Sequence, residues 1–72
     1  MCLAVPGCIL DLGEPPLNYG RVAFGGVVKQ VSLALVPDAA VGRYVLVHAG
    51  TAIQLVDEAA ALEILALLKE MG

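Results

Sequence analysis

The stretch YGRVAFGGVVKQVSLALV, residues 19–36, decides the architecture of this 72-residue chain. Two runs rich in β-branched and aromatic residues, 19–24 and 27–36, favour strands, and Gly25-Gly26 between them can adopt the positive φ angles of a tight hairpin. In the second run, odd-numbered residues share one face and even-numbered residues share the other. We expect one of these faces to lie in the core, with the centre of the strand, Lys29 and Gln30, most exposed.

Three more strands are expected on either side of this hairpin. Residues 2–10 are apolar without a helical period, which predicts an extended segment with a bend or bulge at Pro6-Gly7. Residues 43–49 and 51–55 form two predicted strands, because Gly50 between them permits a sharp change of direction. Glycine and proline mark the intervening loops at 11–18 and 37–42.

A C-terminal helix is predicted from Asp57 to about Met71. Asp57 is a credible N-cap, and Glu58 adds favourable charge at the positive end of the helix dipole. Apolar residues recur at three- and four-residue spacing, namely Ala61, Ile64, Leu65, Leu68 and Met71. This stripe is expected to pack on the strands, while Leu62 and Leu67 widen the apolar surface and leave contact with another protein open.

These elements predict a mainly β protein with one domain over residues 1–72. We expect a small OB-like five-stranded β-barrel over about residues 2–55 and a C-terminal α-helix over about 57–71. Closure into a barrel would remove exposed strand edges. A chain of this length has room for one small core and no second domain.

Composition excludes several classes of function. The net charge is −3, the pI is near 4.7, and the four Lys and Arg residues are scattered, which argues against nucleic-acid binding. Charged residues and proline interrupt every apolar stretch before the roughly 18 residues that a membrane span needs. The N-terminus lacks the basic residues and long apolar core of a secretory signal. We therefore expect a cytoplasmic protein that binds neither nucleic acid nor membrane.

Cys2 is the first candidate for chemistry. Removal of Met1 would leave an ammonium group beside the thiol, which would favour the thiolate and could join sulfur in a chelate on a soft or borderline metal. A disulfide to Cys8 would close a loop too small to restrain much of the chain, so we expect reduced thiols. By position alone, Cys2 is either a functional thiol or an incidental terminal residue.

Cys8 and His48 complete the inventory of candidate metal ligands. Cys8, beside Ile9 and Leu10, is most simply a small core residue. An isolated histidine in an apolar strand is usually a hydrogen-bonded structural residue, and His48 gains weight as a ligand only if strand pairing brings Cys2 near it. The two cysteines and one histidine do not match a closed zinc site. A metal site shared with another protein is compatible with them.

Four segments resemble the HypC/HupF/HybG-type family of nickel–iron hydrogenase maturation chaperones. They are MCLAVPG (1–7), FGGV (24–27), VSLALV (31–36) and VGRYVLVHAG (41–50). The resemblance covers nearly the whole chain, in order and at the expected spacing. The opening motif joined to the YVLVH segment is highly specific.

The resemblance implies an OB-like barrel with a C-terminal helix that acts as an assembly chaperone and not as an enzyme. It implies a complex with the HypD-type iron–sulfur scaffold protein, contact with a HypE-type protein through that complex, and binding to the hydrogenase large-subunit precursor. The implied cargo is a transient Fe(CN)2CO unit shared with a partner, without a permanent cofactor. The matching residues are Cys2, which is implicated in holding the iron unit and contacting partners, and His48 as a second ligand.

Two other functions remain open at this level. The chain could be a metal-free interaction module whose N-terminus is a docking peptide, or an enzyme in which Cys2 and His48 act as nucleophile and base. No third orienting group supports the enzyme. The sequence also departs from the family at Arg43, where an acidic residue is frequent, and at Thr51, where a large aromatic is common. These departures bear on client specificity more than on the general role.

Overall fold

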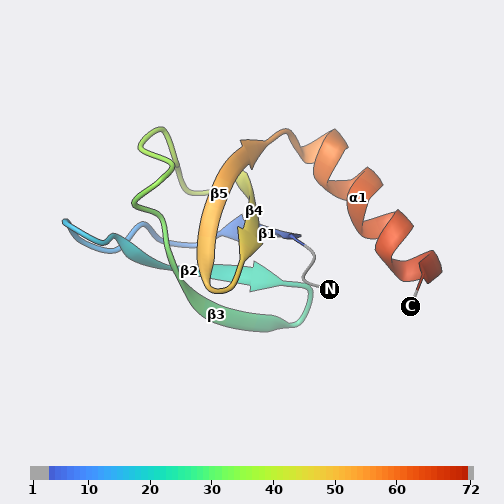
Figure 1. Cartoon of the computed structure of the whole chain (residues 1–72), viewed down its shortest axis with the longest axis horizontal. Coiled ribbons are helices and arrows are strands. Elements are labelled where there is room, and N and C mark those ends of the chain that lie inside the picture. Colours follow the sequence, from blue (N-terminus) through green and yellow to red (C-terminus); the bar gives the residue numbers. More distant parts are fainter. Residues whose placement is uncertain (1–3, 72) are drawn as a thin grey trace.

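The computed structural model describes residues 4–71, which form five strands followed by one helix (Figure 1). The elements are β1 (Val5–Ile9), β2 (Tyr19–Phe24), β3 (Val27–Ser32), β4 (Tyr44–His48), β5 (Thr51–Val56) and α1 (Glu58–Met71). The predicted mainly β fold with five strands and a C-terminal helix is confirmed. No helix in the described part is long and apolar enough to cross a membrane.

The strand pairings form a ring in the order β1-β2-β3-β5-β4, with β4 returning to β1. Four of the five pairings are antiparallel, and the fifth, between β3 and β5, is parallel and consists of one residue pair, Ser32 and Thr51. The ring is therefore closed by a narrow contact on one side. The more specific assignment, an OB-like barrel, stays a prediction.

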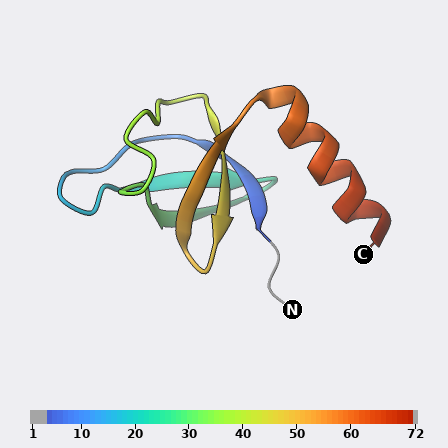
Figure 2. The ribbon, with the colours of Figure 1, turned by 45° about the horizontal axis from the view of Figure 1, so that its top comes forward.

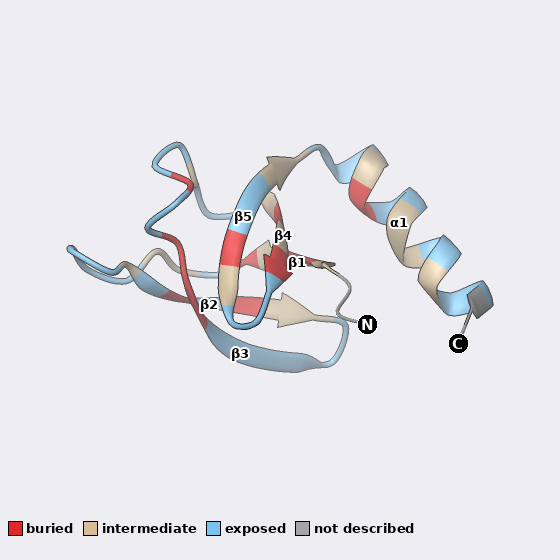
Figure 3. Ribbon diagram, viewed as in Figure 1, coloured by how far each residue is buried: buried red, intermediate tan, exposed pale blue. Residues whose placement is uncertain are grey.

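The core lies inside the ring and receives side chains from all five strands (Figure 3). Its buried members are Ile9, Val22, Val31, Leu33, Val36, Val45, Val47 and Ala52. In β4 the alternation is regular. Val45 and Val47 are buried, whereas the alternate residues are less so: Tyr44 and Leu46 are half-buried, and His48 is exposed. This period of two is what a strand with one face in the core requires.

Of the two options predicted at Pro6-Gly7, the bulge is wrong, whereas a bend in the strand stays a prediction. The register between β1 and β4 runs without interruption from Val5 opposite Val47 to Cys8 opposite Tyr44. Gly7 serves packing instead, because a Cβ atom there would overlap the Val22 side chain and approach Phe24 Cε1 to 2.7 Å. The glycine lets β1 pass close to the inward side chains of β2.

The strand predicted over 27–36 ends early, at Ser32. Beyond it the Val36 N–H donates to the Leu33 carbonyl oxygen at 3.1 Å, which forms a turn. Leu33 and Val36 are both buried and Leu35 is exposed, a three-residue spacing that an extended strand cannot provide. Lys29 and Gln30 are exposed as predicted, but neither face of the strand's first half is buried.

Helix α1 lies to one side of the ring and contacts β1 and β4 (Figure 1). The Ala61 N–H donates to the Asp57 carbonyl oxygen at 2.9 Å, which places Asp57 at the N-cap position, as predicted. Ala61 is fully buried outside the ring's core, and Ile64, Leu65 and Leu68 are half-buried. The predicted apolar stripe is thus confirmed for these residues, while the side chain of Met71 lies outside the described part. Leu62 and Leu67 are exposed.

An ion pair holds the loop after β1 against β2. Asp11 accepts hydrogen bonds from the Arg21 backbone N–H at 3.1 Å and from Arg21 Nε at 2.5 Å. The side-chain hydrogen bond from Arg21, more than any other contact, lowers the pKa of Asp11 below its ordinary value of 3.8. Arg21 is thus exposed but paired.

We predict that Gly7→Ala destabilises the protein by about 1–3 kcal/mol, because the added methyl group overpacks the space occupied by Val22 and Phe24. Urea unfolding followed by circular dichroism measures the change. Gly26→Ala is the matched control, since a Cβ at Gly26 meets no atom within 4 Å. Equal stability of the two variants would show that Gly7 is not required for close packing.

We predict that Asp11→Asn weakens the dependence of stability on acid pH. The pKa of Asp11 is lower in the folded than in the unfolded chain, so its carboxylate stabilises the fold above about pH 4 and this contribution is lost as the pH falls further. The drop in Tm between pH 6 and pH 2.5 should be smaller in Asp11→Asn than in wild type. Asp38→Asn, at an exposed carboxylate in another loop, should keep the wild-type drop.

Candidate functional site

The candidate site lies where β1 begins and β4 ends (Figure 2). These strands are antiparallel, so Val5, the first residue of β1, is opposite Val47, and His48 is the next residue of β4. His48 gains weight as a ligand only if the first strand pairs beside the strand that carries His48 or beside its hairpin partner. The structure provides the pairing with β4.

His48 is exposed and is the last residue of β4. The structure records no hydrogen bond from its imidazole to any residue in the range 4–71. Among residues 4–71, nothing therefore supports the interpretation of His48 as a hydrogen-bonded structural residue. Neither ring nitrogen has a hydrogen-bond partner within the described range, and either one can bind a metal or a partner's side chain.

A tight turn holds His48 in place at the end of its strand. Ala49 and Gly50 have φ angles of 53° and 79°, which is the pair of positive values found in two-residue hairpins. Thr51 then pairs directly with His48 as β5 begins. The backbone on both sides of the imidazole is thus fixed by the β4–β5 hairpin.

The other predicted ligand, Cys2, lies outside the described residues. It precedes Val5 by three residues, and a chain of three residues spans at most about 11 Å. Because Val5 lies opposite Val47, the length of the chain allows a thiol at position 2 to reach the imidazole of His48. The role of both residues as ligands stays a prediction.

Cys8 is separated from this end of the sheet. It pairs with Tyr44, four residues before His48 on β4, which corresponds to about 13 Å along the strand. Its thiol is free and half-buried, in keeping with a packing role more than a role in chemistry. Within residues 4–71, no three His, Cys, Asp or Glu side chains are grouped so that they could hold a metal ion.

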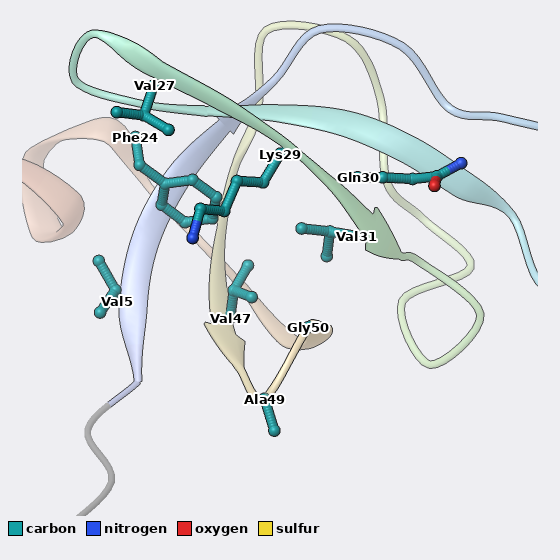
Figure 4. A pocket seen from close by; sticks show the side chains of 9 residues that line it. All are labelled: Val5, Phe24, Val27, Lys29, Gln30, Val31, Val47, Ala49 and Gly50. Atoms are coloured by element: carbon teal, nitrogen blue, oxygen red, sulfur yellow. The ribbon is translucent and has the colours of Figure 1, made fainter.

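A groove of about 440 Å³ opens on the other face of the same strand end (Figure 4). Val5, Phe24 and Val47 point into it from three different strands, and Lys29 extends over it from β3. The flanking residues of His48, Val47 and Ala49, line the groove, whereas the His48 side chain alternates to the outer face. The strand end therefore presents an imidazole on one face and an apolar groove on the other.

Sequence reasoning missed this groove. The sequence feature that could have indicated it is Lys29, a cation on the same strand face as the apolar residues Val27 and Val31. That pattern was interpreted as a solvated strand centre. The convergence of Val5, Phe24 and Val47 depends on pairings between distant segments, which one sequence does not specify.

The fold and the site define a small β domain with an exposed imidazole and an apolar groove at one strand end. The chain belongs to the HupF/HypC family, whose model matches residues 1–68. It is 53% identical over 75 residues to the hydrogenase maturation factor HypC of Synechocystis sp., with 100% of this chain and 99% of the relative covered. It is 43% identical over 72 residues to HypC of Azotobacter chroococcum mcd 1 (100% and 83% covered), and 36% identical over 75 residues to the hydrogenase maturation factor HybG of Escherichia coli K12 (99% and 92% covered).

We predict that His48→Ala changes the free energy of unfolding by less than about 0.5 kcal/mol, because an exposed side chain without hydrogen bonds contributes little to stability. Urea unfolding measures this. Leu46→Ala, two residues earlier and half-buried, should cost more and serves as the positive control. A loss above 1 kcal/mol in His48→Ala would restore the structural role for the imidazole.

Proposed function

We propose that this chain is a hydrogenase maturation chaperone that carries an Fe(CN)2CO unit together with a HypD-type scaffold protein and delivers it to the large-subunit precursor of a nickel–iron hydrogenase. Family membership and the relatives named as hydrogenase maturation factors support the general role. The names describe maturation factors, which favours a chaperone over an enzyme. The specific cargo and partners are the family expectations set out above.

The observation that carries the proposal is the position of His48. It is exposed at the end of β4, beside the start of β1, and the thiol of Cys2 lies within chain reach. A thiolate and an imidazole are ligands suited to iron and other transition metals. Two donors from this chain leave positions for cyanide, carbon monoxide and a partner's ligand.

Incomplete coordination suits a carrier. A closed set of protein ligands would retain the iron unit, whereas two ligands at the edge of a small domain allow a second protein to replace them in turn. The exposed position of His48 permits this exchange without unfolding of the sheet. Contact with a HypE-type protein would then occur through the scaffold complex, as the resemblance implies.

We predict that Cys2→Ala reduces hydrogenase activity in cells to background, because the unit loses its sulfur ligand. Hydrogenase activity in a strain that carries only the variant measures this. Cys8→Ala is the matched control, since it removes the half-buried thiol and should leave maturation close to wild type. Wild-type activity in the Cys2→Ala strain would contradict the proposal.

We predict that His48→Ala lowers the iron retained in the anaerobically purified complex with the scaffold protein. Iron analysis and the infrared bands of bound cyanide and carbon monoxide provide the measurements. If the wild-type complex forms but contains no iron and shows no cyanide or carbon monoxide bands, the chain is the metal-free docking module and not a carrier. Unchanged iron and bands in His48→Ala would remove the histidine from the site.

A further inference from the structure

Within residues 4–71, strand β3 has a free backbone edge. All six of its residues pair with β2, but on the other side only Ser32 pairs, with Thr51 of β5. Among the described residues, no strand pairs with this second edge from Val27 to Val31. Val27 and Val28 are also 54% and 51% exposed, which is unusual for successive valines in a strand.

The alternation of the backbone identifies the groups on this edge. The Ser32 N–H donates to the Gly50 carbonyl oxygen at 3.0 Å, across the β3–β5 side. In a strand, N–H and C=O groups two residues apart point the same way, so those of Gln30 and Val28 face the same side as those of Ser32. Two donors and two acceptors are thus available for an additional strand.

The groove runs along this edge. Val27, Lys29 and Val31 line its β3 side, and Val5, Val47 and Ala49 line it from β1, β4 and the turn (Figure 4). The lining contains no carboxylate, and Lys29 has no acidic side chain within ion-pair distance among residues 4–71. As far as the described part of the chain shows, the groove therefore combines free backbone groups, an apolar lining and one unpaired cation.

We propose that this edge binds an extended segment of a partner protein, which adds a strand to β3 and places an acidic side chain beside Lys29 between two apolar side chains. Added strands gain affinity from backbone hydrogen bonds and specificity from alternate side chains. The residues opposite Val31, Lys29 and Val27 face the groove, so the segment has the pattern apolar-x-acidic-x-apolar. This binding goes beyond the carriage of iron and does not depend on it, because His48 lies on the opposite face of β4.

Charge distinguishes this occupant from a second copy of the chain. If two copies paired antiparallel through Val27–Val31, the central residue, Lys29, would face Lys29 of the other copy. Like charges directly opposite one another destabilise a strand pair, and lysine on an edge strand opposes self-association. An acidic side chain in the same position is attracted.

The test uses the full chain and the acetylated, amidated heptapeptide Thr-Val-Thr-Glu-Thr-Val-Thr, labelled with a fluorophore. The peptide reads the same in both directions, so it fits a parallel or an antiparallel strand. Fluorescence anisotropy gives its Kd, and hydrogen exchange measured by NMR reports the Val28 and Gln30 amides. We expect binding to slow exchange at both amides, since they gain acceptors.

Two variants separate the backbone from the charge. Gln30→Pro removes an N–H on the free edge without removing a bond to β2, and should weaken binding. Lys29→Glu should weaken binding of the Glu peptide by about five- to tenfold and should favour a matched peptide with Lys in place of Glu. Circular dichroism and Tm verify that both variants fold.

Several results would overturn the proposal. Unchanged exchange at Val28 and Gln30 with saturating peptide would place binding elsewhere or exclude it. Slow exchange at these amides before peptide is added would mean that the edge is already occupied, and analytical ultracentrifugation would then show whether a second copy or the chain's own N-terminal residues fill it. If Lys29→Glu bound the Glu peptide and the Lys peptide with equal affinity, the charge at position 29 would play no part in recognition.

Discussion

The pairing of β1 with β4 is the constraint on which the rest of the structure depends. It joins the beginning of the chain to a segment some forty residues later and closes the ring of strands. It also places side by side the two strands that α1 contacts. Gly7 makes this pairing compatible with a filled core, because the absence of a side chain lets β1 lie against Val22 and Phe24.

The same pairing gives the candidate site its geometry. It sets Val5 opposite Val47, so the chain is long enough for Cys2 to reach His48 although the two residues are far apart in the sequence. The outer face of this strand end holds the imidazole, and the inner face borders the groove. A carrier function and a docking function can therefore occupy one end of a very small domain without competing for the same side chains.

Local signals in the sequence predicted much of this fold. Gly25-Gly26 correctly marked the β2–β3 hairpin, and the spacing of Ala61, Ile64, Leu65 and Leu68 correctly marked the buried side of α1. These features depend on near neighbours only. The early end of β3 was missed because Leu33 and Val36 look like strand residues, and only the core behind them shows that a turn buries both.

Features that depend on distant partners were beyond local patterns. Pro6-Gly7 resembled a bulge because the sequence does not reveal which strand crosses there. The exposure of His48 was missed because an apolar neighbourhood in sequence suggested burial, whereas the strand ends at that residue and the turn carries it into solvent. The prediction of Cys2 came from its position in the chain and from the family resemblance.

The junction between β3 and β5 consists of one residue pair, Ser32 and Thr51, so the resistance of the ring to opening differs from one junction to another. Every other junction has two or more residue pairs, so thermal opening should begin at this one and should let the β2–β3 hairpin swing away from the β4–β5 hairpin. The β3–β5 junction is thus the weakest point of the ring, and a segment bound across it would determine how often the two hairpins separate.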